Sequence, residues 1–315
     1  MRSIAWRIAS FRFAAHCSAC SALSLMICVV PVSMGFAAAR DVNSSAERSA
    51  DLWVNNSLTT GRMDLIANAV GNDDALDAMA AASVVYLGET HDEPADHAAQ
   101  LEIIEALSAQ NDIAIALEMF QRPFQPVLDA YLAGNITEAA LISQSEYETR
   151  WGFDWDFYAP ILRYAKNNQI PLIALNTPAE ITRKVASEGL ESLNGQDFQF
   201  VPPIDEIDLS NQAYREQLQA VFDAHGASGN SDGFENFFAA QVLWDETMAE
   251  GVARQRLAEP NRQVVVLVGE GHIGYDRGIP DRVARRLPEI AQVSVQFLGA
   301  DESSKPGFTD LFWRL

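Results

Sequence analysis

Short apolar runs rich in β-branched residues alternate along this chain with stretches of helical periodicity, and this alternation is the strongest constraint on its fold. Strands that are buried on both faces read as continuous apolar runs rather than as an apolar–polar alternation. The sequence therefore predicts an α/β fold, with a mostly parallel central sheet and helices on both of its faces. The expected strands cover residues 83–88, 112–119, 171–176, 263–268 and 292–298.

Two long stretches, near 120–160 and 205–259, carry helical periodicity without a strand between the helices. They predict helical insertions that pack over the carboxyl-terminal ends of the strands. The α/β domain that contains them is expected to span 71–300. We expect an N-terminal arm at 40–70 before this domain and a C-terminal tail at 301–315 after it.

The first 39 residues differ in composition from the rest of the chain. They hold three arginines and no acid, include an apolar run at 23–36 and end in three alanines, which are the parts of a secretory signal peptide. The alternative, an N-terminal membrane anchor, needs about 20 uninterrupted apolar residues, and serine and cysteine interrupt this run. Neither Cys17 nor Cys28 lies in a convincing lipobox. We therefore expect an exported protein, periplasmic or secreted, with outer-membrane association left open.

Removal of the first 39 residues changes the chemistry that the chain can offer. All three cysteines lie in this segment, so the mature chain has no thiol that could ligate a metal or act as a nucleophile. The net charge of the whole sequence is −21, and loss of three arginines leaves 19 basic and 43 acidic side chains, a net charge of −24. A charge this negative argues against DNA, RNA and anionic membranes as partners.

Side chains with catalytic chemistry directly follow the expected strands. Glu89 and His91 come after the first strand, Glu118 ends the second, and His272 follows the fourth. Because open α/β sheets gather their sites beyond the carboxyl ends of the strands, we expect these four side chains to converge. They suit a divalent metal held by Glu89, His91 and His272, or a metal-free histidine base oriented by glutamate. The structural alternative is that they cap helices and tie strand ends to turns.

An arginine-rich segment follows the last of these motifs, in a chain that is otherwise strongly acidic. Its arginines could receive the carboxylates of an anionic ligand. Alternatively, they pair with the neighbouring Asp276 and Asp281. The arginines concerned are Arg277, Arg282, Arg285 and Arg286.

Several ordered motifs together resemble the ChaN family of haem-binding lipoproteins. This family belongs to a superfamily with the Tiki/TraB metalloprotease-like proteins and the erythromycin-esterase-like enzymes. The resemblance implies an exported α/β protein that binds haem and takes part in haem or iron acquisition or storage in the cell envelope. Family members are often lipid-anchored, and the missing lipobox puts such an anchor in doubt here. The motifs are GETHDEPADHAAQ at 88–100, ALEMFQRPFQPVLDAYL at 116–132, WGFDWDFYAPILRYAKNNQIPLIALN at 151–176, QVLWDETMA at 241–249 and VVLVGEGHIGYDRGIPDRV at 265–283.

The resemblance makes haem the expected cofactor, and haem iron is commonly held by tyrosine or histidine. Tyr275 is the first candidate for the iron ligand, because it lies in a loop beside arginines. His272 would then hydrogen-bond to this ligand and Arg277 would meet the propionates. Tyr158 and His97 are the next candidates.

Other interpretations stay open at this point. The resemblance also allows a metal-dependent hydrolase or protease of the Tiki-like type on Glu89, His91 and His272, or a metal-free esterase-like hydrolase in which Glu118 takes part. The expected partners are haem and cell-envelope haem-uptake components, with a homodimer left open. One helix carries an aromatic stripe that could contact haem, although ordinary core is the stronger interpretation. The stripe consists of Phe234, Phe237, Phe238, Trp244 and Met248.

Overall fold

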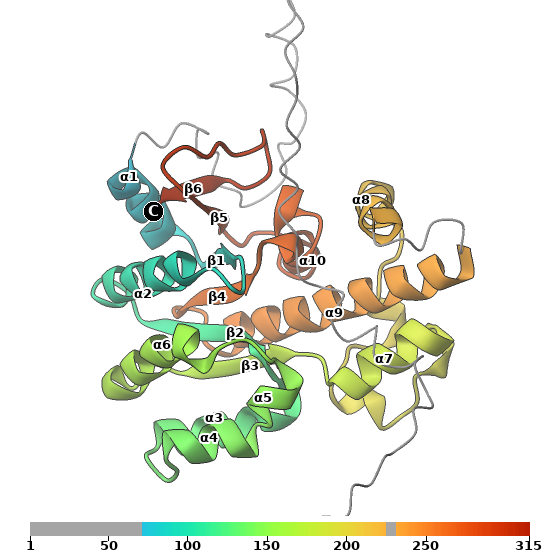
Figure 1. Ribbon diagram of the computed structural model, residues 1–315, viewed down its shortest axis with the longest axis horizontal. Coiled ribbons are helices and arrows are strands. Elements are labelled where there is room, and N and C mark those ends of the chain that lie inside the picture. The colour runs from blue at the N-terminus through green and yellow to red at the C-terminus, as the bar shows by residue number, and fades with distance from the viewer. Residues whose placement is uncertain (1–70, 225–230) are drawn as a thin grey trace, which may run out of the picture. The chain divides into compact units, whose positions relative to one another are not determined.

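A computed structural model describes residues 71–224 and 231–315 of the chain (Figure 1). The expected signal peptide at 1–39 and the expected N-terminal arm at 40–70 lie outside the described residues. Within them, six strands form one sheet in the order β3-β2-β4-β1-β5-β6, and every neighbouring pair is parallel. The strands are β1 (Val84–Glu89), β2 (Ile113–Gln121), β3 (Leu172–Asn176), β4 (Gln263–Gly269), β5 (Gln292–Leu298) and β6 (Leu311–Arg314).

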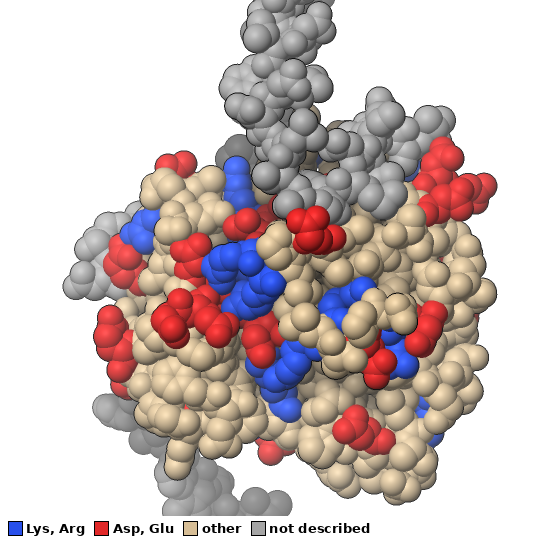
Figure 2. Space-filling view, turned by 180° about the vertical axis from the view of Figure 1, so that it is seen from behind, with Lys and Arg blue, Asp and Glu red and all other residues tan. Residues whose placement is uncertain are grey.

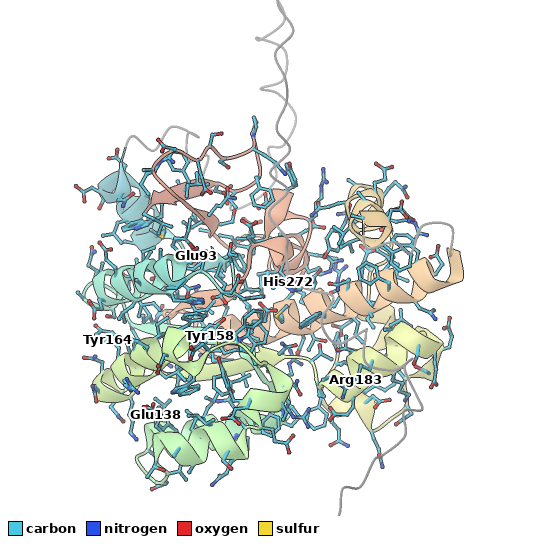
Figure 3. The ribbon with its side chains drawn as sticks, in the orientation of Figure 1. Glu93, Glu138, Tyr158, Tyr164, Arg183 and His272 are labelled. Atoms are coloured by element: carbon cyan, nitrogen blue, oxygen red, sulfur yellow. The ribbon has the colours of Figure 1, made fainter. Side chains whose placement is uncertain are left out.

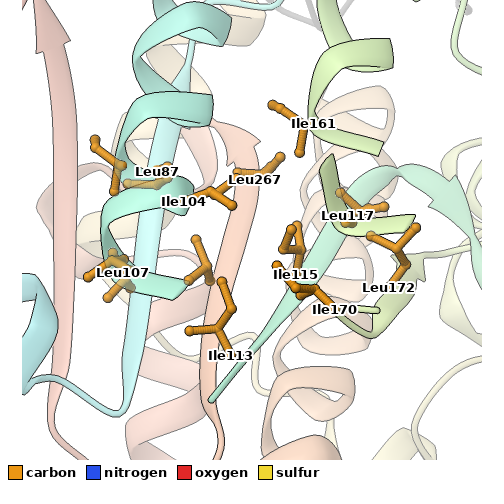
Figure 4. Packing of buried hydrophobic residues seen from close by; sticks show 14 of the residues in the cluster. Leu87, Ile104, Leu107, Ile113, Ile115, Leu117, Ile161, Ile170, Leu172 and Leu267 are labelled. Atoms are coloured by element: carbon orange, nitrogen blue, oxygen red, sulfur yellow. The ribbon is translucent and has the colours of Figure 1, made fainter. Parts of the chain in front are cut away.

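Helices cover both faces of the sheet, which confirms the predicted fold class. The helices are α1 (Asn72–Ala81), α2 (Pro94–Ser108), α3 (Gln125–Leu132), α4 (Glu138–Gln144), α5 (Tyr147–Arg150), α6 (Trp155–Asn168), α7 (Ala179–Glu188), α8 (Gln212–Phe222), α9 (Ser231–Ala258) and α10 (Ile279–Arg286). On one face, Leu87 and Ile115 pack with Ile104 of α2 and Ile161 of α6 (Figure 4). On the other face, Val266 belongs to a second core, together with α9 and α10.

The helical insertions lie where the sequence places them. The segment near 120–160 forms α3, α4, α5 and the start of α6, and the segment near 205–259 forms α8 and α9. The first half of α9 packs with α7 and α8 around a third apolar core that includes Val185, Tyr214 and Phe238. Its second half contributes Met248 and Val252 to the core beneath the sheet. Helix α9 therefore joins the insertion to the main domain.

The end of the chain adds a strand that the sequence did not predict. Residues 301–315 were expected to form a tail, but β6 pairs with β5, and Val295 lies opposite Leu311. At this edge of the sheet, the side-chain amide of Asn72 donates to the Arg314 carbonyl and accepts from the Arg314 amide, both at 3.0 Å. Because unpaired strand edges promote aggregation, these contacts protect β6.

A side-chain amide protects the opposite edge in the same way. Gln125 of α3 donates to the carbonyl of Leu172 at 2.8 Å and accepts from the amide of Ala174 at 2.7 Å. The side chain thus occupies the position of a further strand beside β3. Among the described residues, no helix has both the length and the apolar character needed to cross a membrane.

Candidate functional site

The carboxyl ends of three adjacent strands bring the four predicted strand-end residues together. In the order β2-β4-β1, Glu89 is paired with Gly269 across the sheet. The Nδ1 atom of His91 lies 2.8 Å from Glu89 Oε1, and Nε2 of His272 lies 3.4 Å from Glu118 Oε1. Each of the two histidines therefore contacts a glutamate that belongs to the sheet.

Glu89 is the buried anchor of the first half of this cluster. Its side chain is almost fully buried and accepts hydrogen bonds from Tyr158 Oη at 2.6 Å and from Gln100 Nε2 at 2.7 Å. His97 is also buried, and its Nε2 lies 3.1 Å from the carbonyl oxygen of His91. Figure 3 labels Tyr158, which lies on α6, and His272, which follows β4. Helices α2 and α6 thus hold the turn that presents Glu89 and His91.

Glycine at two strand ends lets side chains pass very close to the backbone. A Cβ atom on Gly269 would lie 2.9 Å from both Cε1 and Nε2 of His91. A Cβ atom on Gly88 would lie 2.5 Å from Cδ1 of Ile273. The two glycines of the strand-end motifs therefore make room for the packing of the site, whatever its chemistry.

The helical insertion completes the second half of the cluster. Asp245 of α9 places Oδ1 2.6 Å from His272 Nδ1, and its Oδ2 accepts a 2.6 Å hydrogen bond from Tyr214 of α8. Asp245 is fully buried, and Tyr214 and His272 are nearly so. The sequence analysis did not identify Asp245 or Tyr214. The signal that could have found Asp245 is an acidic residue within the apolar face of α9.

The electrostatics of the cluster favour a protonated His272. Burial disfavours its charge, but the carboxylates of Glu118 and Asp245 outweigh burial and raise the pKa of His272 to about 10. For Glu118, burial opposes ionisation, but His272, His91 and the Gly269 amide lower the pKa of its carboxyl group. The pKa of His91 is raised because Glu89 and Glu118 outweigh the opposing effect of burial. The site therefore holds a fixed imidazolium between two carboxylates at neutral pH.

Comparison with known proteins assigns the chain to a family. The family model described as "Haem-binding uptake, Tiki superfamily, ChaN" matches residues 75–283. The chain belongs to the ChaN family. A solved structure of ChaN from Campylobacter jejuni, described as cofacial haem binding, superposes with a TM-score of 0.59 at 19% identity, over 76% of this chain and 90% of that chain. This likeness shows that the two proteins share a fold.

Two other similar proteins are more distant from this ChaN-family chain. Protein RETICULATA-RELATED 5, chloroplastic, of Arabidopsis thaliana is 27% identical over 254 residues, which cover 74% of this chain and 34% of the relative. The chain thus spans about a third of the length of that curated relative. A solved erythromycin esterase mutant in its open conformation is 15% identical, covers 76% of each chain and has a TM-score of 0.44.

The candidate haem ligands of this ChaN-family chain lie in different environments. Tyr275 is partly exposed and adopts a left-handed backbone conformation, with φ of 56°. The guanidinium of Arg277 lies 4.7 Å from the centre of its ring, and Phe308 packs edge-on against it. In contrast, Tyr158 and His97 are buried and bonded to the Glu89 turn.

The remaining arginines of the arginine-rich segment are held by one buried acid. Arg285 and Arg286 each place a guanidinium nitrogen 2.6 Å from Glu246 Oε2, and Arg282 lies 3.4 Å from Glu246 Oε1. Glu246 is fully buried on α9. These three arginines therefore fasten α10 to α9. Of the four arginines, Arg277 is the one that lies beside Tyr275.

The three predicted metal ligands are Glu89, His91 and His272. Among residues 71–224 and 231–315, no group of three or more His, Cys, Asp and Glu side chains is arranged to hold a metal ion. The Nδ1 atoms of His91 and His272 face different carboxylates, so Glu89 and His91 contact each other, whereas His272 contacts Asp245. The arrangement instead suits transfer of protons between histidine and carboxylate.

The aromatic stripe on α9 is core rather than a haem-contacting surface. Phe234, Phe238 and Met248 are at most 3% exposed and belong to the apolar cores. Trp244 packs edge-on against His272, with 5.1 Å between the ring centres. The stripe thus contacts the site through Trp244, which packs against His272.

Proposed function

We propose that this chain is an exported ChaN-family protein that binds haem and serves haem or iron acquisition or storage in the cell envelope. The match of the haem-binding family model over residues 75–283 is the observation that carries this proposal. The N-terminal segment at 1–39, with its signal-peptide pattern, supports export. Figure 2 shows Lys and Arg side chains lying among Asp and Glu side chains on one face, a mixed surface unlike a continuous nucleic-acid-binding patch.

Tyr275 is the side chain best suited to ligate the haem iron. Its ring is partly exposed, whereas Tyr158 and His272 are buried and bonded to carboxylates. The adjacent Arg277 guanidinium would stabilise a phenolate and could meet a haem propionate. Haem would supply a Lewis-acidic iron, and Tyr275 would hold it at the molecular surface. His272 has no ring nitrogen left for the iron, because both of its ring nitrogens already face carboxylates.

A haemin titration of the full chain tests this proposal. We expect a saturable Soret shift that the Tyr275→Phe variant loses or displaces. Tyr164→Phe is the matched control, because Tyr164 lies on α6 with its hydroxyl 2.8 Å from Ser108. An unchanged haem spectrum in the Tyr275→Phe variant would refute the ligand assignment. Absence of saturable haem binding by the wild-type chain would refute the haem-binding function itself.

Export and assembly are tested separately from the ligand. Expression of the full chain in a Gram-negative host, followed by fractionation and mass spectrometry, should yield a periplasmic or secreted product that begins near residue 40. Full-length protein retained in the cytoplasm would argue against export. Sedimentation with and without haemin would show whether haem promotes a homodimer, and pull-down from envelope extracts would test for haem-uptake components.

A second candidate function is metal-free hydrolysis, favoured by the two histidine–carboxylate pairs. His91 would accept a proton from water as the water oxygen attacks an ester carbonyl carbon. His91 would then return this proton to the leaving alkoxide, while the protonated His272, held by Asp245 and Glu118, would supply a fixed positive charge. Glu89 and Asp245 would fix the ring orientations through the Nδ1 atoms.

Hydrolysis of p-nitrophenyl esters tests this second candidate. We expect activity that is unaffected by EDTA and is lost in the His91→Ala and His272→Ala variants, with Tyr164→Phe again as control. Loss of activity on chelation would instead favour the metal-dependent hydrolase. Equal rates in the wild-type protein and both histidine variants would refute a catalytic role for the cluster.

A further inference from the structure

A chain of tyrosine and tryptophan rings leads from the surface to the buried carboxylate of Glu89. The ring centres of Trp155 and Tyr147 are 4.9 Å apart, and those of Tyr147 and Tyr158 are 6.4 Å apart. Trp151 approaches Tyr158 from another side, at 6.3 Å. The two tryptophans are partly exposed, and both tyrosines are buried. The four oxidisable rings thus form one continuous packed set.

The hydrogen bonds of the two buried tyrosines differ in a way that matters for oxidation. Tyr158 donates a short 2.6 Å hydrogen bond to Glu89, a length typical of a hydroxyl bonded to a carboxylate. Tyr147 places its hydroxyl in the interior with no hydrogen-bond partner among the described residues. A tyrosine is oxidised readily only when its proton can leave, so Tyr158 is the favoured resting place for an oxidising equivalent.

Glu89 is the direct acceptor of that proton, because its Oε1 atom lies 2.6 Å from the Tyr158 hydroxyl. It accepts hydrogen bonds from Gln100 and Tyr158, and Nδ1 of His91 lies 2.8 Å from its Oε1 atom. Burial and the nearby Glu89 carboxylate raise the pKa of Tyr158, which keeps its phenol protonated before oxidation. Proton loss by Tyr158 is therefore tied to electron loss.

We propose that Trp155, Trp151, Tyr147 and Tyr158 form a one-electron relay that ends on Tyr158. A strong one-electron oxidant, such as a small radical, removes an electron from an exposed tryptophan and leaves an indole radical cation. An electron then passes from Tyr158 to that radical cation and restores the neutral indole. In the same step the O–H bond of Tyr158 breaks, its proton forms a bond to Glu89, and a neutral tyrosyl radical remains.

This relay would give the protein a function distinct from haem binding, namely the capture of oxidising equivalents at a defined tyrosine. The packing makes the route specific, because Tyr147 connects Trp155 to Tyr158. Tyr164 lies on the same helix in a different environment. Its hydroxyl is hydrogen-bonded to the Ser108 hydroxyl, whereas the Tyr158 hydroxyl is hydrogen-bonded to a carboxylate. The two tyrosines therefore form a matched pair for a test.

Pulse radiolysis of the full-length protein with azide radical tests the relay without haem, so its outcome does not depend on the proposed haem function. Azide radical oxidises exposed tryptophan, and the absorption of the tryptophan radical should decay as the phenoxyl absorption rises with the same rate constant. We expect this rate constant to be independent of protein concentration in the wild-type and Tyr164→Phe proteins. Tyr158→Phe should lose most of the intramolecular transfer.

A second variant keeps the test decisive if Tyr158→Phe fails to fold. Glu89→Gln preserves a hydrogen-bond acceptor but removes the basic carboxylate, so we expect transfer at least several-fold slower, in protein whose circular dichroism matches the wild type. Wild-type transfer should also slow in D2O, because the proton moves with the electron. Unchanged transfer in both Tyr158→Phe and Glu89→Gln, or phenoxyl formation that depends on protein concentration, would overturn the proposal.

Discussion

Asp96 carries a buried carboxyl group whose ionisation should weaken the folded state. It lies in the first turn of α2, is 4% exposed, and its Oδ2 accepts a 2.8 Å hydrogen bond from the Thr90 amide. Burial is the largest influence and, together with the nearby Glu93 and Glu89, it raises the pKa of Asp96 from 3.8 to about 7, against the opposing Thr90 hydrogen bond. The folded protein therefore favours the protonated acid.

The Asp96→Asn substitution should remove this penalty while it keeps an oxygen that can accept the Thr90 hydrogen bond. A pKa that is higher in the folded state makes a contribution to stability that is complete below about pH 4 and is lost as the pH rises towards 7. At ~1.4 kcal/mol for each pKa unit, the upper limit of the loss is about 4 kcal/mol. The variant should therefore be more stable than the wild type above pH 7 and similar near pH 4.

Urea unfolding between pH 4 and pH 8 measures this difference directly. Asp92→Asn is the control, because Asp92 is exposed in the turn that precedes α2. We expect the stability difference between Asp96→Asn and the wild type to grow with pH, whereas Asp92→Asn should follow the wild type. A constant difference across the whole pH range would show that the reasoning about Asp96 is wrong.

Three further predictions concern the site and the core. Gly269→Ala should cost about 1–3 kcal/mol by urea unfolding and shift the NMR signals of His91, whose ring lies 2.9 Å from the position of the new Cβ atom; wild-type stability and spectra would contradict this. Asp245→Asn should lower the NMR-measured pKa of His272. The loss of stability in this variant should be greatest below about pH 6.5 and shrink towards pH 10, because the contribution of a raised histidine pKa is complete below the unfolded-state pKa and is lost as the pH reaches the folded-state pKa. Leu267→Ala, in the sheet core, should cost about 2–5 kcal/mol, and a cost below about 1 kcal/mol would show that the core relaxes there.

Much of the architecture could be predicted because it depends on local patterns. A buried parallel strand must be apolar along its whole length, and Gln263–Gly269 is buried at every position. Parallel strands also place their carboxyl ends at one edge of the sheet, so the proximity of Glu89, His91, Glu118 and His272 followed from where the strands end. These features need no knowledge of how distant segments pack.

Other features depend on packing between segments far apart in the sequence. Residues 311–314 have a short strand signal, and they form β6 because β5 offers a free parallel edge and Asn72 covers the new one. The arginine-rich segment allowed either a ligand or local aspartates as partners, and the placement of α9 gave three of its arginines Glu246 instead.

The sequence by itself determined the alternation of strands and helices, the sheet edge at which charged residues gather, and the family to which the chain belongs. Only the tertiary structure decided which side chains act together there. Asp245 lies 27 positions from His272 in the sequence, and Tyr214 lies 31 positions from Asp245. The Asp245 carboxylate oxygens nevertheless lie 2.6 Å from His272 Nδ1 and 2.6 Å from Tyr214 Oη. The physical reason is that periodicity specifies which face of a helix is buried, whereas the partner that a buried polar group finds depends on where that helix docks.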